Sequence, residues 1–175
     1  GMYLLRGAPK GDGPVVRLIG SGPIMVQVLD AVEKLETYGV RAEIYSATSY
    51  GELRREGLDC DRHNRLHPTD DLQKPWVETL LSEPISTVAV SDNMAAVPDM
   101  IRQWVSGPYT VLGTDGFGRS DTREALRRFF EIDGAAIALA ALSSLVREGK
   151  VDAKVYAKAE KNFAVSTERP DIAGL

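Results

Sequence analysis

A few side chains in this sequence are of types that perform chemistry, and their spacing decides which chemistry each can support. The Gly-Ser-Gly segment at residues 20–22 lies between an apolar run and a helical pattern, a position where backbone amides bind phosphate. It lacks the third glycine of a dinucleotide fingerprint and the Gly-Lys-Ser/Thr of a P-loop. We therefore expect a structural turn there and no nucleotide site.

Two histidines and the single cysteine form a second candidate group. His63 and His67 are four residues apart, so a helix would place both on one face. No glutamate follows His63 directly and Pro68 ends the segment, which favours surface or interface histidines over a zinc site. Cys60 precedes His63 by three residues, but without a third group to orient the pair it is a weak candidate for a catalytic thiol.

Asp92 and Asp115 each follow a predicted strand, as a phosphoacceptor aspartate does. A receiver domain also needs an acidic pair after its first strand, and this chain has residues 20–22 at that position, which excludes the class. No nucleophile, base and orienting group fall together at a recognisable spacing. The residues alone thus predict no catalytic, cofactor-binding or metal site in this chain.

Length and composition indicate a single soluble domain. The chain has 175 residues, of which 43% are apolar, enough for one core. Its net charge of −4, with scattered Lys and Arg, argues against nucleic acid and against a polybasic membrane contact. The longest apolar run, residues 135–142, is shorter than the roughly 20 residues that span a bilayer. One cysteine and the lack of a secretory signal pattern lead us to expect a cytoplasmic protein.

Predicted strands and helices alternate along the chain, which indicates a three-layer α/β/α sandwich over residues 1–165. The strands are predicted at residues 2–5, 15–19, 41–46, 87–90 and 109–112. The helices are predicted at residues 24–38, 52–56, 75–81 and 94–105, with a further turn at residues 62–66 and three helical segments between residues 122 and 163. Residues 166–175, rich in Ser, Thr, Pro and Gly, are predicted to be a mobile tail.

The last predicted strand is expected to be buried. Residues 114–121 connect it to a helix, and within them two glycines flank Phe117. Asp121 with Glu124 has the acidic form of a capping box, and Ser120 is an alternative cap. The carboxyl end of a strand in an open α/β sheet is where ligands and partner surfaces lie. The loop is therefore either a well-capped connection or a functional surface.

Several segments, taken together and in order, resemble the C-terminal domain of the homodimeric pyruvate dehydrogenase decarboxylating component, within the transketolase C-terminal-like superfamily. They are residues 1–5 (GMYLL), 45–57 (YSATSYGELRREG), 60–68 (CDRHNRLHP), 112–123 (LGTDGFGRSDTR) and 130–133 (FEID). The Phe-Gly-x-Ser loop is shared with the wider transketolase group, whereas Thr-Ser-x-x-Glu-Leu and Leu-His-Pro favour the pyruvate dehydrogenase branch.

The resemblance implies a mixed, mostly parallel sheet in the order 1-3-2-4-5, with strand 1, supplied by residues 2–5, antiparallel. It implies a longer enzyme whose two further domains, absent from this chain, bind thiamine diphosphate and magnesium. That enzyme would decarboxylate pyruvate and acetylate the lipoyl group of dihydrolipoyl acetyltransferase. We expect the present domain to be inactive alone and to support dimerisation and active-site architecture.

Within this resemblance, one face of the domain is expected to contact the upstream domains or the second subunit. Its members are Asp115, Gly116, Phe117, Gly118, Arg119, Ser120 and Arg123. Phe117 would enter an apolar contact, because an exposed Phe between glycines otherwise lacks a role. Arg119 or Arg123 would pair with a carboxylate across that contact.

Two other kinds of function remain open at this point. The acidic residues 59–61 with Asp70 and Asp71 are a candidate docking surface for the acetyltransferase. A stand-alone flavodoxin-like module would instead bind a small molecule between residues 20–23 and 113–118.

Overall fold

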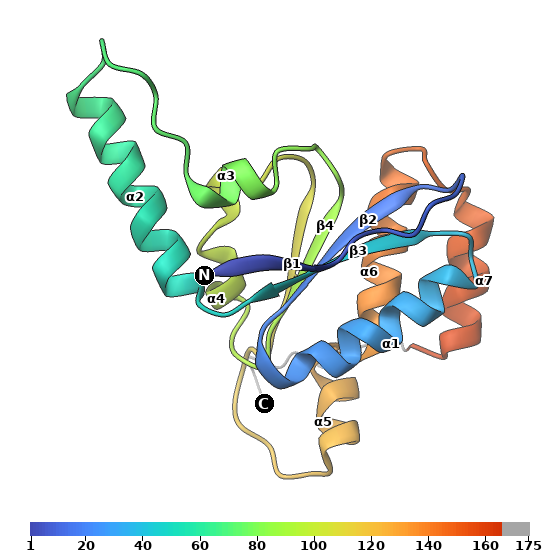
Figure 1. Ribbon diagram of the computed structural model, residues 1–175. Helices are drawn as coiled ribbons and strands as arrows, with labels where there is room; N and C mark the ends of the chain where they lie inside the picture. Colours follow the sequence, from blue (N-terminus) through green and yellow to red (C-terminus); the bar gives the residue numbers. More distant parts are fainter. Residues whose placement is uncertain (166–175) are drawn as a thin grey trace.

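The computed structural model describes residues 1–165 as a five-stranded sheet between two layers of helices (Figure 1). The strands are β1 (Met2–Arg6), β2 (Val15–Gly20), β3 (Arg41–Ala47), β4 (Thr87–Val90) and β5 (Tyr109–Leu112). Their order is β1-β3-β2-β4-β5, and β1 runs antiparallel to β3 while the other neighbours are parallel. This topology confirms the predicted fold. The predicted mobile tail at residues 166–175 lies outside the described residues.

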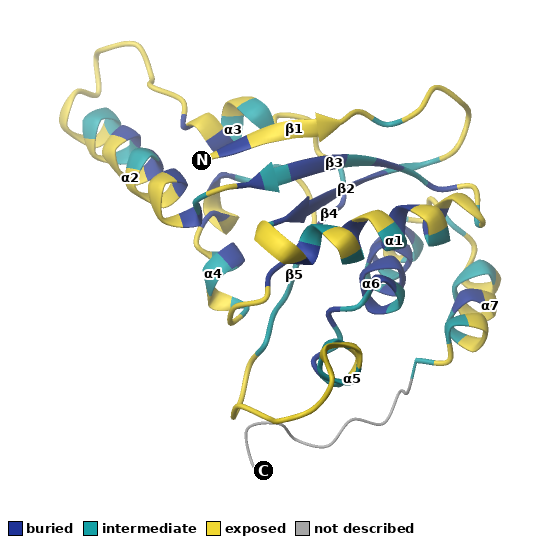
Figure 2. Ribbon diagram, turned by 60° about the horizontal axis from the view of Figure 1, so that its bottom comes forward, coloured by how far each residue is buried: buried dark blue, intermediate teal, exposed yellow. Residues whose placement is uncertain are grey.

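The helices divide between the two faces of the sheet (Figure 2). They are η1 (Gly22–Ile24), α1 (Met25–Glu36), α2 (Tyr50–Leu66), α3 (Trp76–Leu80), α4 (Ala96–Asp99), η2 (Arg102–Trp104), α5 (Arg123–Phe129), α6 (Gly134–Arg147) and α7 (Ala153–Phe163). α1, α6 and α7 pack on one face, and α2, α3 and η2 pack on the other. α5 lies beyond one end of the sheet (Figure 1), and its Leu126 and Phe129 pack against the cluster that α1 and α6 cover.

Two apolar clusters fill the space on either side of the sheet. Leu18 and Ile44 point into the cluster that α1 and α6 cover, whereas Ile19 and Tyr45 point into the opposite one. Successive strand residues therefore bury opposite faces, which explains why β2 is apolar nearly throughout. The stretch Arg123–Arg147 is long and apolar enough to cross a membrane, but its apolar part is mostly buried in this fold, and α6 is a core helix.

The segment after β3 is one long helix, so the prediction of a short helix at residues 52–56 and a separate turn at residues 62–66 is wrong. Ser49 caps α2 by accepting the N–H of Glu52. Gly57, in the middle of α2, does not interrupt it, because its missing side chain makes room for a ring. A Cβ atom there would lie 2.6 Å from the ring of Trp104. The glycine marks a close approach between elements and not a helix end.

The predicted helix at residues 94–105 is also wrong, since the chain forms two short pieces there, α4 and η2. Pro98 lies in the first turn of α4, where a helix tolerates a residue without an N–H, so it does not determine where α4 ends. Strand β5 is only partly buried, contrary to the prediction for residues 109–112, because it is an edge strand with one neighbour, β4.

Tyr50 and Tyr109 provide a matched test of buried hydroxyl groups. The Tyr109 hydroxyl donates to the carbonyl oxygen of Pro98 at 2.7 Å. The Tyr50 hydroxyl is buried without a hydrogen-bond partner in residues 1–165. We expect Tyr109→Phe to lower the free energy of unfolding by about 1 kcal/mol and Tyr50→Phe to leave it unchanged or raise it. Urea unfolding of both variants measures this, and equal losses would contradict it.

The two buried phenol groups should also make the stability of the fold sensitive to alkali. Burial raises the pKa of Tyr50 and of Tyr109 above the ordinary phenol value. Above roughly pH 10 the unfolded chain releases phenol protons that the folded chain retains, so stability falls as the pH rises. Tyr50→Phe should reduce the slope of stability against pH in this range, and an unchanged slope would speak against burial of that phenol.

Candidate interface at the carboxyl end of the sheet

The loop that follows β5 is packed directly against the loop that follows β4. A Cβ atom on Gly113 would lie 2.3 Å from the backbone nitrogen of Ala95 and 2.6 Å from the carbonyl oxygen of Asn93. The N–H of Thr114 donates to that same Asn93 oxygen at 2.9 Å. Gly113 is therefore required for the close approach of the two backbones, which fixes where the next residues emerge.

Asp115 joins the same two loops by its side chain. Its carboxylate accepts the N–H of Ala95 at 3.0 Å, and the Thr114 hydroxyl donates to the carbonyl oxygen of Asp92 at 3.1 Å. Asp92 and Asp115 thus follow neighbouring strands, as the sequence indicated. The bond made by Asp115 holds the base of the loop in place.

The tip of the loop presents an aromatic side chain to solvent. Gly116 has a φ of 97°, a left-handed conformation that favours glycine. Phe117 follows with 69% of its surface exposed. A Cβ atom on Gly118 would meet no atom within 4 Å. A large apolar side chain on an anchored but open loop is typical of a contact surface.

Arg119 returns the loop to the body of the domain. Its guanidinium carbon lies 4.2 Å from the centroid of the Phe129 ring, a cation–π contact with α5. Arg119 therefore positions the loop from within the domain. Ser120 and Arg123 are both exposed, and Arg123 is the first residue of α5. Arg119 is exposed as well, although its guanidinium contacts the Phe129 ring.

The cap of α5 differs from the prediction. Thr122 is the N-cap residue, and its side chain accepts the N–H of Ala125. Asp121 accepts the N–H of Thr122 at 2.7 Å, one residue before the helix. The predicted box of Asp121 with Glu124 and the alternative cap Ser120 are therefore wrong by one or two residues, since Thr122 is itself a good cap.

The glycines at residues 20–22 have structural roles. A Cβ atom on Gly20 would lie 2.4 Å from the sulfur of Met25, and Gly22 has a φ of 68°. Gly20 thus allows α1 to pack closely on the end of β2, and Gly22 provides the turn. The space that a ligand would need beside Gly20 is filled by the Met25 side chain.

His63 and His67 lie on one face, as their spacing predicts. Their rings stack with centroids 4.6 Å apart, and His67 Nδ1 lies 3.7 Å from the carboxylate of Asp70. Within residues 1–165 no three metal-ligating side chains come together. The two histidines contribute to packing at the end of α2.

Cys60 lies in an environment that disfavours a reactive thiol. It is buried, and its sulfur lies 3.5 Å from a carboxylate oxygen of Glu56. Burial, followed by the nearby Glu56 carboxylate, raises the pKa of the Cys60 thiol. The fraction of nucleophilic thiolate at neutral pH is correspondingly low.

We expect Cys60 to be alkylated slowly in the folded chain. At pH 8, modification by iodoacetamide should be about tenfold slower or more than in the urea-unfolded chain, because both thiolate content and access are reduced. Mass spectrometry of the labelled protein over time gives both rates. Equal rates in the two states would show that Cys60 is accessible and ionised in the fold.

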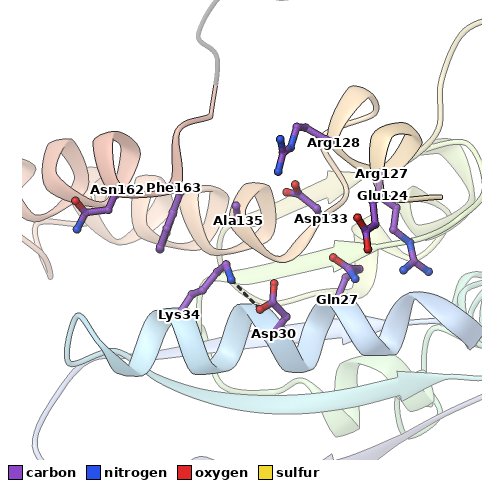
Figure 3. Close-up of a pocket in the computed structure, with 10 residues that line it drawn as sticks. All are labelled: Gln27, Asp30, Lys34, Glu124, Arg127, Arg128, Asp133, Ala135, Asn162 and Phe163. Atoms are coloured by element: carbon purple, nitrogen blue, oxygen red, sulfur yellow. Dashed lines mark hydrogen bonds and ion pairs between the residues drawn. The ribbon is translucent and has the colours of Figure 1, made fainter. Parts of the chain in front are cut away.

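Sequence reasoning missed a cleft of about 420 Å³ between α1, α5, α6 and α7 (Figure 3). It is lined by Gln27, Asp30, Lys34, Glu124, Arg127, Arg128, Asp133, Ala135, Asn162 and Phe163. Lys34 donates to Asp30 at 2.7 Å, and the Gln27 side chain accepts the N–H of Gly134 at 3.0 Å. The second of these bonds joins α1 to α6. Gln27 and Gly134 are 107 positions apart, so no local pattern could have indicated the cleft.

The residues of the predicted face follow one another in the chain between the end of β5 and the start of α5. They run from the anchored Asp115 through the exposed Phe117 to Arg123 at the start of α5. Phe117 presents an apolar group and Arg123 a positive charge, and both kinds of group bind the surfaces of other proteins. The predicted face offers no nucleophile paired with a base.

Comparison with known proteins identifies the family to which this chain belongs. The sequence profile of the transketolase-like TK C-terminal domain matches residues 1–133, more than half of the chain. The chain belongs to the transketolase-like C-terminal domain family. The resemblance inferred from the sequence motifs is thereby confirmed.

Curated relatives of this transketolase-like domain are pyruvate dehydrogenase E1 components. That of Corynebacterium glutamicum is 47% identical over 166 residues, which is 93% of this chain and 18% of the relative. Those of Mycolicibacterium smegmatis and Escherichia coli K12 are 42% and 40% identical, over 94% and 97% of the chain. The chain spans less than a fifth of the length of these relatives.

Solved structures show the same fold at lower sequence identity. A transketolase from Pichia stipitis matches with a TM-score of 0.56 at 18% identity, over 86% of this chain and 19% of that one. A chain titled split gene transketolase, inactive beta4 tetramer, matches with a TM-score of 0.54 at 16% identity, over 83% of this chain and 42% of that one. These matches support the transketolase C-terminal fold.

Proposed function

We propose that these 175 residues are the C-terminal domain of a thiamine diphosphate-dependent pyruvate dehydrogenase decarboxylating component. The longer enzyme decarboxylates pyruvate and acetylates the lipoyl group of dihydrolipoyl acetyltransferase in the cytoplasm. The observation that supports this most directly is identity of 40–47% over nearly the whole chain to relatives named pyruvate dehydrogenase E1 component.

In this proposal the domain supports the enzyme without carrying its chemistry. The described residues do not fit thiamine diphosphate and its magnesium. Gly20 and Gly22 are used for packing and a turn, and no cluster of three metal ligands occurs in residues 1–165. We therefore place both cofactors in the upstream domains. The cofactor, when bound there, stabilises the carbanion formed on decarboxylation.

The role we propose for the loop of residues 115–123 is contact with the middle domain or with the second subunit of a homodimer. Phe117 supplies the apolar anchor and Arg123 a guanidinium at the rim. Asp115 and Arg119 hold the loop in the required position, through Ala95 and Phe129 respectively. Aromatic and Arg anchors at the centre of a contact commonly provide most of its binding energy.

The test is to measure pyruvate turnover by the longer polypeptide, by a version ending before Gly1, and by the 175 residues alone. Each is assayed with thiamine diphosphate and magnesium. We expect turnover by the longer polypeptide, loss of turnover in the truncated version, and none from this chain by itself. Turnover by these residues alone would require a catalytic set within them and would contradict the proposal.

The two alternatives receive less support from the described residues. Asp61 accepts from the side chains of Gln103 and Trp104, and Asp70 lies beside His67, so part of the acidic docking surface is engaged within the domain. A flavodoxin-like site would need open space beside Gly20 and Gly113 at the strand ends, and neither glycine has such space beside it. Met25 fills the first position, and the backbone of the β4 loop fills the second.

A further inference from the structure

Strand β1 forms one edge of the sheet and exposes most of its apolar side chains. Tyr3 is 50% exposed, and Leu4 and Leu5 are each 48% exposed. β3 is the only strand that pairs with β1 in the part of the chain that the structure describes. An apolar edge strand is a template for pairing with another segment. Of the usual protective features, β1 has one charge, at Arg6, and a shift in its register with β3 between Leu4 and Arg6, so the part of the edge from Met2 to Leu4 is left regular.

The backbone of β1 shows which groups face the open edge. The carbonyl oxygen of Gly1 accepts the N–H of Thr48 at 2.7 Å, on the side of β3. The carbonyl oxygen of Met2 accepts instead from the indole nitrogen of Trp76 at 3.0 Å. Because backbone groups in an antiparallel strand alternate in direction, those of Leu4 point outward like those of Met2.

Trp76 extends this surface and is held rigidly. The Glu56 carboxylate accepts its backbone N–H, with oxygens at 3.0 and 3.2 Å, and the bond to Met2 fixes the ring. Trp76 is nevertheless 47% exposed. Beside it lies a groove of about 330 Å³, lined by Gly1, Glu52, Leu53, Arg55, Glu56 and Trp76. Half-exposed aromatic rings with fixed geometry are typical anchors of contact surfaces.

Under the proposed function, further polypeptide precedes Gly1 and lies next to this surface. Gly1 itself lines the groove, so any residue attached to its nitrogen starts there. The relatives are more than five times as long as the matched region, which leaves a large polypeptide to be placed. A tethered segment has a high effective concentration at an adjacent surface, which favours it over a second copy of the chain.

We propose that the part of the polypeptide that precedes Gly1 covers β1 and Trp76. It packs apolar side chains on Tyr3, Leu4 and Trp76, and it satisfies the outward backbone groups of Leu4. This inference rests on the proposed function, under which the chain continues upstream. The surface is separate in sequence from the Phe117 loop, so the domain has two contact surfaces.

Hydrogen exchange tests whether the surface is covered. Single-residue exchange is compared between the 175-residue chain and the longer polypeptide. We expect the Leu4 amide to exchange at about a tenth of its rate or less in the longer polypeptide, as a newly protected group does. The Tyr3 amide, which faces β3, serves as the control and should change much less. Equal Leu4 rates in the two proteins would overturn the inference.

Photo-crosslinking identifies the occupant. Benzoylphenylalanine replaces Tyr3 in the longer polypeptide, and a matched variant carries it at Lys158, an exposed position in α7 at the opposite end of the domain (Figure 1). Mixed ¹⁴N and ¹⁵N subunits distinguish contacts within one polypeptide from those between two. We expect crosslinks from position 3, and not from position 158, to upstream residues of the same polypeptide.

Isotopically mixed crosslinks from position 3 would assign the surface to a second copy and overturn the inference. Crosslinks only to a different protein would do the same. Pyruvate turnover is measured on the same preparation before irradiation. An active enzyme without the upstream crosslink would reject this inference alone, whereas an enzyme without pyruvate activity would reject the proposed function.

Discussion

Replacing Arg17 with Met should lower the free energy of unfolding by about 3 kcal/mol, because it leaves a carboxylate without its partner. Arg17 lies in β2 with only 2% of its surface exposed, and its Nε lies 2.6 Å from a Glu43 oxygen. The guanidinium carbon also lies 5.5 Å from the centroid of the Tyr45 ring. Met fills a similar volume but provides neither the charge nor the donors. Urea unfolding of the 175-residue chain measures the loss.

The double variant Arg17→Met with Glu43→Gln separates lost charge pairing from lost packing. The glutamine side chain carries no charge, so we expect the double variant to be more stable than the single one by about 1 kcal/mol or more. Glu43 is partly exposed, which keeps the penalty at the lower end of the range for buried pairs. A single variant that loses less than about 1 kcal/mol, or a double variant equal to it, would show that the ion pair does not stabilise the sheet.

The position of Arg17 also shows what sequence patterns can and cannot reveal. The apolar run around it predicted a strand covered on both faces, and β2 is such a strand. The run could not show that Arg17 would be buried, since its partner Glu43 lies 26 residues away on β3. A buried charge depends on contacts between elements, and periodicity describes only single elements.

The same distinction explains the errors in the helices. Gly57 and Pro98 are both helix-disfavouring residues, yet the first lies inside a continuous helix and the second in a short one. The role of Gly57 depends on its contact with the ring of Trp104. The sequence close to residue 57 does not include Trp104 and so could not reveal that contact. Pro98 lies in the first turn of its helix, where a missing N–H is tolerated, so this residue does not mark where the helix ends.

The exposure of Phe117 was predictable because its signal is local. Two glycines around an aromatic residue at a strand end indicated an exposed Phe, and Phe117 is exposed. The anchors of the Phe117 loop were not predictable. Asp115 bonds to a backbone N–H 20 residues away, and Arg119 stacks on a ring in the next helix. Sequence motifs thus predicted the exposure of Phe117, and the structure shows the contacts that hold the loop around it.

Phe117→Ala in the longer polypeptide should weaken its dimerisation or lower its pyruvate turnover about 30-fold, the effect of losing about 2 kcal/mol from a contact anchor. The isolated chain should keep its stability within about 0.5 kcal/mol, because 69% of the Phe117 surface is already exposed there. Sedimentation over a concentration series gives the dimer dissociation constant, and steady-state kinetics give the turnover.

Leu72→Ala provides the matched control, since Leu72 is an apolar side chain of comparable exposure, 73%, between α2 and α3. It should change neither dimerisation nor turnover, which separates loss of a specific anchor from loss of any exposed apolar surface. A defect confined to turnover would assign Phe117 to the middle domain of its own subunit, and a defect in dimerisation would assign it to the subunit contact. If Phe117→Ala behaved like Leu72→Ala in both measurements, the loop would be only a well-capped connection between β5 and α5.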